Sequence, residues 1–398
     1  MLLKKLIIIC CMLTAGVLYG QITNVPDTIF EQFLIDQGID SDGLLNGQVL
    51  TADINTIETF DTMNTDIEDF TGIEGFTALK ILICAGSNVN GPLDMTSNVF
   101  LEELYASDSF LESLDISTCS LLRILDIEDN ALTVLDVSNN PLLEEAYIGN
   151  ETEDVPPFNS FINLDFTNNP NLRILNTFDV LTLTSIDLTG AINIRNLDVA
   201  VCALTELDVS TNVNLETLLV GTFEDFFLGT SNEISSLDLS NNGSLVGLNV
   251  HNTDLSNLNL KNGNNGIIAG VIATQTPNLA CILVDDETAA ANGDAPYDTW
   301  QVDAGTQFSE TECTIGVEDY LLETIEMFPN PVVDILTIQY NRQLVMDTIT
   351  IYDILGKKMF VVRDDFSGAV DMQLLPSGVY FVRMEIGDAV LTKKVLKK

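Results

Sequence analysis

One acidic side chain recurs at a fixed place through the middle of the chain. A motif of Leu or Ile, an acid and an apolar residue is centred in turn on Asp94, Asp115, Asp136, Asp165, Asp187, Asp208 and Asp238, and its last copy carries Asn259. If each motif is a short extended segment, its central side chain faces outward and the aspartates form one column. Neighbouring carboxylates about 4.8 Å apart repel by roughly 0.9 kcal/mol in water before screening. The column therefore needs a compensating interaction.

Two kinds of chemistry can supply it. The favoured one is local hydrogen bonding, in which each carboxylate accepts from a backbone N–H or from a nearby hydroxyl. Suitable hydroxyls follow at Ser117, Ser138, Thr189, Ser210 and Ser240. The alternative is a divalent cation held between adjacent aspartates, because calcium prefers oxygen ligands. Calcium is the only cofactor that the sequence leaves open.

A second acidic stretch, Asp40-Ser41-Asp42-Gly43 with Asn46, resembles the start of a calcium loop. Counting from Asp40, Thr51 stands where a helix–loop–helix site has its acidic twelfth residue. A turn in a capping segment is the favoured interpretation.

Catalytic chemistry has little support. His251 is the sole histidine, and neither Gly-x-Ser-x-Gly nor His-Glu-x-x-His occurs. Acid pairs are so abundant that a glycosidase dyad is not formally excluded, yet this abundance makes any chosen pair uninformative. We expect no catalytic residues, with a secreted hydrolase as the weakest alternative.

Cysteines offer a covalent constraint. Cys281 and Cys313 flank one segment after the repeats, and we predict a disulfide between them. Cys84 falls at an inward position, where a thiol behaves as a small hydrophobe. Five cysteines follow the first twenty residues, so they do not all pair within one chain, and the pairing of Cys84, Cys119 and Cys202 stays open.

The elements that position these residues form a repeat. The pattern Leu-x-x-Leu-x-apolar starts at Ile57, Leu79, Leu101, Leu122, Leu143, Leu172, Ile194, Leu215 and Leu245. Successive starts are 21 or 22 residues apart, except for steps of 29 and 30 that mark insertions near 151–160 and 221–232. One such unit has no closed core, so units must stack. The sequence predicts a solenoid of about nine coils built mostly from short β-strands.

The run Leu122-x-x-Leu125-x-Ile127-x-x-Asn130-x-Leu132 carries a family resemblance. It is similar to the leucine-rich repeat pattern, and its period resembles the bacterial, internalin-like forms. Asn130, Asn140 and Asn242 occupy turn positions, where an amide can satisfy unpaired backbone groups. In other coils the position of Asn130 holds Thr, Ser or Cys, so a less regular ladder is expected there.

The ends of a solenoid need covers. We predict an N-terminal cap over residues 21–56 with an amphipathic helix near Phe30–Ile35. The repeats follow over 57–276, and a C-terminal cap containing the only tryptophan, Trp300, spans 277–315. A linker covers 316–326.

Two segments, one at each end of the sequence, have the features of targeting segments. Residues 1–20, with Lys4, Lys5 and a short apolar run, are predicted to be a signal peptide. Residues 327–398 carry short β patterns that predict a small antiparallel β-sandwich. The landmarks of this segment are Pro329, Asn330, Pro331, Gly356, Gly378, Tyr380, Lys393 and Lys394.

These landmarks resemble the type A C-terminal sorting domain of the type IX secretion system of Bacteroidota. The resemblance implies export across both membranes, contact with the secretion machinery, and removal of the domain with release or attachment to lipopolysaccharide. No later segment reads as a transmembrane helix.

The distribution of charge distinguishes these two end segments from residues 21–326, the body of the chain. The chain has 398 residues and a net charge of −43, and residues 21–326 hold 51 of its 59 acids but only five of its 16 bases. Such a body repels phosphate backbones, so nucleic acid is a poor partner.

The leading hypothesis is a secreted or cell-surface binding or adhesion protein for an extracellular protein or glycan. Tyr105 and Tyr147 are the candidate contacts, because Tyr combines apolar area with a hydroxyl; they could equally pack against each other across coils. The alternative is a passive acidic surface or matrix protein with cation bridging.

Overall fold

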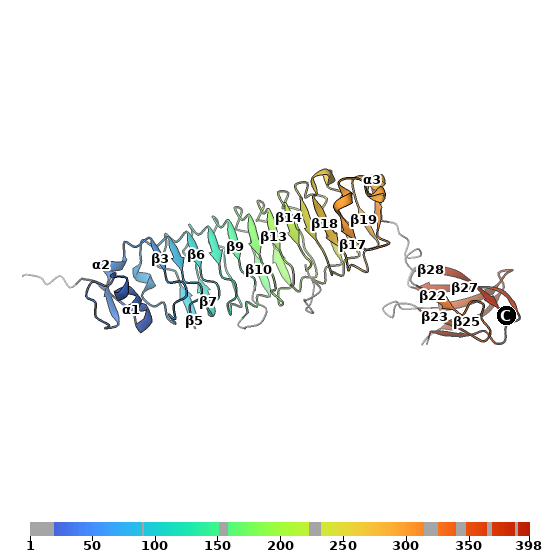
Figure 1. Ribbon diagram of the computed structural model, residues 1–398, viewed down its shortest axis with the longest axis horizontal. Helices are drawn as coiled ribbons and strands as arrows, with labels where there is room; N and C mark the ends of the chain where they lie inside the picture. Colours follow the sequence, from blue (N-terminus) through green and yellow to red (C-terminus); the bar gives the residue numbers. More distant parts are fainter. Residues whose placement is uncertain are drawn as a thin grey trace, which may run out of the picture.

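The computed structural model describes residues 20–89, 91–150, 158–222, 232–313, 325–339, 348–363, 368–386 and 389–398. The predicted signal peptide at 1–20 and linker at 316–326 lie almost wholly outside these ranges, and most of both insertions does too. Residues 57–313 wind into a solenoid in which each coil contributes one strand to a long parallel sheet (Figure 1).

The long sheet has eleven described strands, two more than the starts recognised in the sequence. In spatial order they are β3 (Thr59–Asp61), β4 (Ile81–Ile83), β6 (Glu103–Tyr105), β8 (Ile124–Asp126), β9 (Glu145–Tyr147), β11 (Ile174–Asn176), β13 (Asn196–Asp198), β14 (Thr217–Leu219), β16 (Gly247–Asn249), β18 (Gly270–Ala273) and β20 (Gln301–Val302). The middle residue of a strand points inward, as Leu104, Leu125 and Leu175 do. Within each three-residue strand the two flanking side chains point outward.

The acidic motifs lie on the opposite side of each coil and form shorter parallel sheets. These comprise β5 (Gly91–Asp94) with β7 (Leu111–Asp115), β10 (Asn163–Asp165) with β12 (Ser185–Asp187), and the set β15 (Ser236–Asp238), β17 (Asn257–Asn259), β19 (Cys281–Leu283) and β21 (Gln307–Ser309). The motifs around Asp136 and Asp208 are not strands. The apolar residues from both sides meet in one core that runs through the solenoid.

Buried amides connect successive coils at the turns. Asn140 Nδ2 donates to the carbonyl oxygens of Ile116 (3.2 Å) and Cys119 (2.8 Å), and Asn130 Nδ2 donates to those of Ala106 and Ile127. The same bonding recurs at Asn98, Asn169, Asn212 and Asn242. These side chains satisfy carbonyls that the turns leave unpaired, as predicted.

The N-terminal end is covered by β1 (Ile22–Asn24), α1 (Thr28–Asp36), β2 (Gln48–Leu50) and α2 (Thr51–Ile54). Asp27 caps α1 by accepting from the backbone N–H groups of Ile29 and Phe30. Phe30 packs against Phe60 of the first coil, with ring centroids 5.7 Å apart. The short helix η1 (Ile73–Gly75) follows.

At the other end the cover continues the repeat instead of replacing it. Strands β18, β20, β19 and β21 extend the two sides, joined by η2 (Asn265–Ile267), α3 (Glu287–Asn292) and η3 (Tyr297–Thr299). Trp300 packs edge-on against Tyr297, with ring centroids 4.7 Å apart. Its position between Tyr297 and Phe308 makes it part of the core of this end.

The C-terminal segment folds as a sandwich of two antiparallel sheets. One contains β22 (Glu326–Phe328), β23 (Ile335–Gln339) and β26 (Ala369–Asp371). The other contains β25 (Lys358–Arg363), β24 (Thr348–Asp353), β27 (Gly378–Ile386) and β28 (Ala389–Lys397). A separate apolar core including Leu336, Ile351 and Val382 lies between them.

Candidate functional site

The exposed face of the long sheet carries a row of two tyrosines around an aspartate. Strand register places Tyr105 of β6 beside Asp126 of β8, and Asp126 beside Tyr147 of β9. The two tyrosines are therefore separated by a whole strand and do not occupy adjacent coils. They do not form the direct pair across neighbouring coils that their shared position could suggest.

A carboxylate on the same strand holds each tyrosine hydroxyl. Tyr105 Oη donates to Glu103 Oε2 at 3.0 Å, and Tyr147 Oη donates to Glu145 Oε2 at 3.1 Å. Residues two apart on a strand face the same side, which brings each pair together. The sequence Glu-x-Tyr thus repeats on β6 and β9 around the intervening Asp126.

Burial first, and then the bond to the carboxylate, raises the pKa of Tyr105 and of Tyr147 to about 12. Both phenols are therefore neutral at physiological pH and donate their protons to Glu103 and Glu145. Each side chain is half-buried, with its orientation fixed by that bond. A fixed aromatic surface loses little conformational entropy on binding, which suits a contact role.

Sequence reasoning missed a charged column at the edge of this sheet, here called the edge column. It consists of the residue immediately before each of the first eight strands: Glu58, Lys80, Glu102, Arg123, Glu144, Arg173, Arg195 and Glu216. Backbone bonds join its members in order; Arg123 N–H donates to Glu102 O and Glu144 N–H to Arg123 O. Four of the five bases in residues 21–326 lie here. The position of each base one residue before a strand was the signal available in the sequence.

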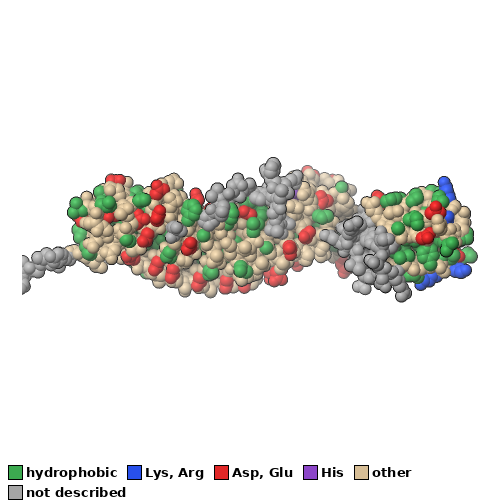
Figure 2. All heavy atoms as spheres, turned by 90° about the horizontal axis from the view of Figure 1, so that it is seen from below, with side chains coloured by type: hydrophobic (Ala, Val, Ile, Leu, Met, Phe, Trp, Pro, Cys, Tyr) green, Lys and Arg blue, Asp and Glu red, His purple; other side chains and the backbone are tan. Residues whose placement is uncertain are grey.

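Ion pairs connect the edge column from coil to coil. Lys80 Nζ lies 2.8 Å from Glu58 Oε2, and Glu144 accepts from both Arg123 (2.9 Å) and Arg173 (2.8 Å). Arg195 pairs with Glu216. The bond from Arg123 lowers the pKa of Glu144. The bases of the body are therefore used largely to join coils. On the face seen in Figure 2, the acids of the solenoid are scattered among uncharged and hydrophobic side chains.

Each member of the aspartate column accepts a hydrogen bond from the backbone two residues later. The acceptor is Oδ1 in every copy, and the donors are the N–H groups of Thr96, Ser117, Ser138, Thr167, Thr189, Ser210 and Ser240, at 2.8–3.0 Å. Asn259 makes the same bond to Lys261 N–H. This is the local interaction favoured from the sequence.

Hydroxyls reinforce this arrangement at some positions. The Ser117 side chain, followed by its backbone N–H, lowers the pKa of Asp115, and Ser138, Thr189 and Ser210 do the same for Asp136, Asp187 and Asp208. Asp165, Asp187 and Asp208 line a shallow hollow of about 480 Å³ with Asn163 and Ser185. The carboxylates of Asp115, Asp136, Asp187 and Asp208 are therefore stabilised as anions by groups of the protein.

The acidic loop of the N-terminal cap is likewise internally bonded. Asp40 Oδ1 accepts from Asp42 N–H, and Asp42 Oδ1 accepts from Leu44 N–H. Ser41 donates to Asp53 Oδ2. Across the described ranges, no group of three or more His, Cys, Asp or Glu side chains is arranged to hold a metal ion. The bonds that Asp40, Ser41 and Asp42 make are those of a turn.

His251 has structural contacts of its own. Its backbone N–H donates to Asn249 Oδ1 at 2.9 Å, and its Nδ1 lies 2.7 Å from Thr274 Oγ1. Neither of these two contacts involves a serine or cysteine nucleophile.

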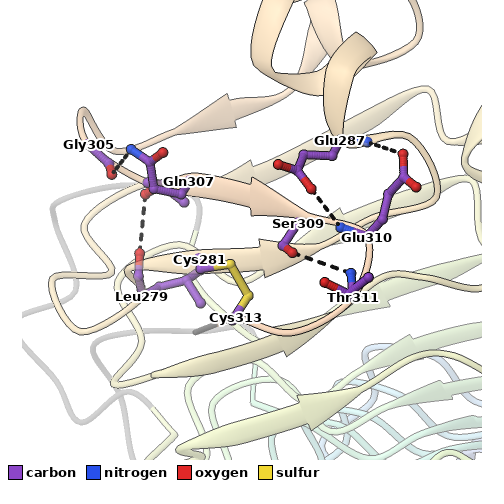
Figure 3. Close-up of a disulfide and its surroundings, with 10 residues drawn as sticks. Leu279, Cys281, Glu287, Gly305, Gln307, Ser309, Glu310, Thr311 and Cys313 are labelled. Atoms are coloured by element: carbon purple, nitrogen blue, oxygen red, sulfur yellow. Dashed lines mark hydrogen bonds between the residues drawn. A yellow bond between two sulfur atoms is a disulfide. The ribbon is translucent and has the colours of Figure 1, made fainter. Parts of the chain in front are cut away.

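Cys281 and Cys313 form a disulfide across the last coil (Figure 3). Beside it, the backbone N–H groups of Glu287 and Glu310 each donate to the other's carboxylate, at 3.0 and 3.3 Å. Cys84, Cys119 and Cys202 are buried free thiols. Burial raises the pKa of Cys84 and Cys202 to about 12 and that of Cys119 to about 11, so these thiols are poor nucleophiles.

In the C-terminal sandwich, Asn330 holds the final strand. Its Nδ2 donates to Lys394 O at 3.3 Å, and its Oδ1 accepts from Leu396 N–H at 2.9 Å. Pro329 and Pro331 flank this side chain. Lys393 and Lys394 are paired within β28 to Val382 and Phe381 of β27.

Other landmarks of this segment fix its turns. Gly356 has a φ of +78°, which favours glycine, and closes the turn before β25. Gly378 begins β27, and the buried Tyr380 donates its hydroxyl proton to Pro376 O at 2.9 Å. The landmark residues thus stabilise the sandwich and the attachment of its last strand.

Comparison with known proteins gives one family match. Residues 326–398 match the family described as the secretion system C-terminal sorting domain. No curated protein matches the chain.

Among solved structures, the functional domain of InlJ from Listeria monocytogenes, which includes a cysteine ladder, is 20% identical with a TM-score of 0.46, covering 95% of this chain and 99% of that one. InlP from Listeria monocytogenes is 14% identical with a TM-score of 0.41, and the match covers 94% of this chain and 98% of InlP. Internalin C2 from the same species is 14% identical with a TM-score of 0.34, and the match covers 60% of this chain and 91% of internalin C2.

The repeat motif and the coil geometry define the body as a leucine-rich repeat solenoid, and the family match over residues 326–398 defines the segment after it as a type IX secretion C-terminal sorting domain. The sorting domain indicates secretion or cell-surface attachment. Within the described ranges, no helix has the length and apolar character needed to cross a bilayer.

Proposed function

We propose that the protein is a non-catalytic extracellular binding or adhesion protein, exported by the type IX machinery and bound to a protein or glycan through the exposed face of the long sheet. The observation that carries this proposal is the row Tyr105–Asp126–Tyr147, in which two half-buried aromatic side chains are fixed by Glu103 and Glu145. Fixed aromatic contacts are typical of binding hot spots.

The repeat supports this proposal because its inward and outward positions have different roles. Inward positions are apolar and hold the fold, whereas outward positions vary among Ile83, Tyr105, Asn176 and Leu219 along the same column. A rigid surface with variable outward residues provides specificity without altering the core. The buried thiols and the local bonding of the acids fit a role without catalysis.

The ligand test compares intact cells and matrix components for binding of the purified protein and its variants. Tyr105→Ala with Tyr147→Ala is expected to reduce binding at least tenfold, since hot-spot truncations cost about 2 kcal/mol or more. Thr96→Ala with Ser117→Ala, on the opposite side of the coils, is the control and is expected to leave binding unchanged. Equal binding by all three proteins contradicts the proposed face.

Export is tested separately. Deleting residues 326–398 is expected to abolish surface exposure, measured by proteolysis of intact cells and mass analysis of the mature ends. Surface exposure of the deleted protein would contradict the export route. Deleting the gene and measuring attachment separates adhesion from a passive matrix role, for which no change in attachment to a specific ligand is expected.

A further inference from the structure

Beside the edge column runs a second set of residues, here called the apolar ridge. It consists of Phe100, Leu121 and Leu142, each two positions before the edge-column residue of its coil. Their side chains are 51%, 37% and 40% exposed, and Val99 beside them is 45% exposed. Because the three lie at the same place in three successive coils, they form one contiguous exposed strip. Contiguous exposed apolar surface marks an interaction site more often than single exposed residues do.

The ridge has no evident role within its own coils, and later coils show what this position does elsewhere. Asn171, Asn193 and Asn214 occupy it in the next three coils. Their amides donate to the carbonyl oxygens of Pro141 (3.0 Å), Pro170 (2.8 Å) and Ile192 (3.2 Å) of the preceding coil. Asparagine at this position thus joins neighbouring coils, whereas the ridge residues leave apolar surface in water. The fold accepts asparagine at this position in the later coils, so the apolar residues of the ridge require another explanation.

The charges beside the ridge suggest what covers it. The first six members of the edge column alternate in sign: Glu58, Lys80, Glu102, Arg123, Glu144 and Arg173. An alternating row of even length is its own complement when turned by 180° about its midpoint. That midpoint lies between Glu102 and Arg123. A second copy turned in this way places Glu102 against Arg123, Lys80 against Glu144, and Glu58 against Arg173.

Two of the three ridge residues flank this midpoint, and the rotation places the third, Leu142, against Ala78 of the other copy. Phe100 and Leu121 belong to the same two coils as Glu102 and Arg123, so the rotation that matches the charges also brings Phe100 of one copy onto Leu121 of the other. Self-complementarity about a two-fold axis is the requirement for a symmetric dimer interface. An apolar centre with a charged rim is the usual composition of such a patch.

Net charge restricts where a second copy can approach. Residues 21–326 carry 51 acids against five bases, and four of those bases are in the edge column. Two copies repel each other over most of their surface, but the edge column contains four acids and four bases and is locally neutral. The strip is therefore the part of the body where like molecules can meet without opposed acidic surfaces.

From these observations we propose that the apolar ridge and the first six members of the edge column form a symmetric, antiparallel homodimer interface. The interface is small, so the dimer is weak in dilute solution and gains from crowding on a surface. It lies at the edge of the long sheet and is distinct from the row Tyr105–Asp126–Tyr147.

Sedimentation velocity of the purified full chain over a wide concentration range tests the proposal. The wild-type protein is expected to shift from monomer to dimer with rising concentration. Arg123→Glu is expected to raise the dimer dissociation constant about tenfold, because the two-fold axis makes each new like-charge contact occur twice. The double variant Glu102→Arg with Arg123→Glu restores opposite charges across the axis and is expected to recover dimerisation.

The double variant also changes contacts within one chain. The first change puts a positive charge next to Lys80 and the second puts a negative charge next to Glu144, so the ion pair of Arg123 with Glu144 is not repaired, while the reversed charges at positions 102 and 123 still attract each other between neighbouring coils. Arg195→Glu makes the same change of charge in the same column outside the six-residue pattern, and is expected to dimerise like wild type. A purely structural role for the column predicts instead that Arg195→Glu behaves like Arg123→Glu.

The ridge has its own matched variant. Phe100→Asn with Leu121→Asn copies the residues of the later coils and is expected to abolish dimerisation while leaving the unfolding midpoint within error. A protein that stays monomeric at every concentration overturns the proposal. Unchanged dimerisation in the ridge variant overturns it too, and so does failure of the charge-reversed double variant to recover.

Discussion

At the scale of single residues, buried amides carry bonds that no neighbouring side chain can replace. Asn140 is fully buried, and its two bonds to Ile116 O and Cys119 O join one coil to the previous one. Asn140→Ala leaves both carbonyls without donors and is expected to lower the free energy of unfolding by about 1–3 kcal/mol. Urea unfolding measures the loss. Asn139→Ala, at the exposed neighbour, is the control, and equal effects of the two changes would contradict the role of the amide.

The aspartate column gives a residue-scale prediction for pH. Hydroxyl and backbone donors lower the folded-state pKa of Asp115, Asp136, Asp187 and Asp208. A lowered folded-state pKa adds stability above the unfolded value of about 3.9, and this stability is lost as pH falls through the folded value. Replacing all four by Asn keeps an acceptor, as Asn259 does, but removes the titration. The difference in urea midpoint between wild type and variant is therefore expected to shrink as pH falls below about 4.

These aspartates are largely exposed, so the difference is expected to be small at each site and is best measured with all four changes together. A difference that stays constant from neutral pH to acid would show that the carboxylates gain nothing from their donors as anions.

At the scale of elements, the two sides of a coil satisfy their polar groups in different ways. The acidic motif ends in a turn that its own carboxylate closes, so no external ion is needed to hold one coil against the next. Thermal melting is therefore expected to be unchanged between excess calcium and EDTA. A rise in melting temperature with calcium that disappears in Asp187→Asn would instead place an ion in the column.

The sequence was sufficient to predict those elements whose buried residues follow the repeat spacing. The spacing from Ile57 to Leu245 predicted nine strands of the long sheet, and Asn140 and Asn242 were placed correctly at turns. The tenth strand was missed although Ile268 and Val271 keep the motif, because the step from Leu245 is 23 residues. The eleventh was missed because α3 and η3 intervene before Gln301.

The candidate site was harder to predict from the sequence than the fold was. Tyr105 and Tyr147 could be assigned to one outward column with Asp126 between them, and the strand register agrees. The bonds of their hydroxyls to Glu103 and Glu145 could not be read from the repeat spacing. The edge column was overlooked because its members lie one residue outside the strands, where a single sequence gives no hydrophobic signal. The alternation of charge is visible in the sequence once the residues that follow the repeat starts are compared.

At the scale of the whole molecule, the disulfide closes the free end of the solenoid. Cys281 and Cys313 are 32 residues apart, and a loop of that length is expected to stabilise the folded end by about 3–4 kcal/mol. Trp300 is the only tryptophan and lies in the same end, so its fluorescence reports on this region. Cys281→Ala with Cys313→Ala is expected to lower the urea midpoint seen by fluorescence more than the midpoint seen by circular dichroism.

Alkylation with and without reductant, followed by mass measurement, checks the bond itself. Two additional alkylated thiols after reduction are expected. Coincident fluorescence and dichroism transitions in the variant would mean that the last coils unfold only with the rest of the solenoid.

The stacking of coils also has a mechanical consequence. Each coil contacts chiefly its two neighbours, so a pulling force along the chain can remove one coil from an end without disturbing those further in. A coil of 21 or 22 residues releases about 70 Å of chain when it is drawn out. A molecule held at a cell surface and bound to a distant ligand would then lengthen in steps under tension and keep its remaining coils folded, and the disulfide sets the end from which this unwinding is resisted.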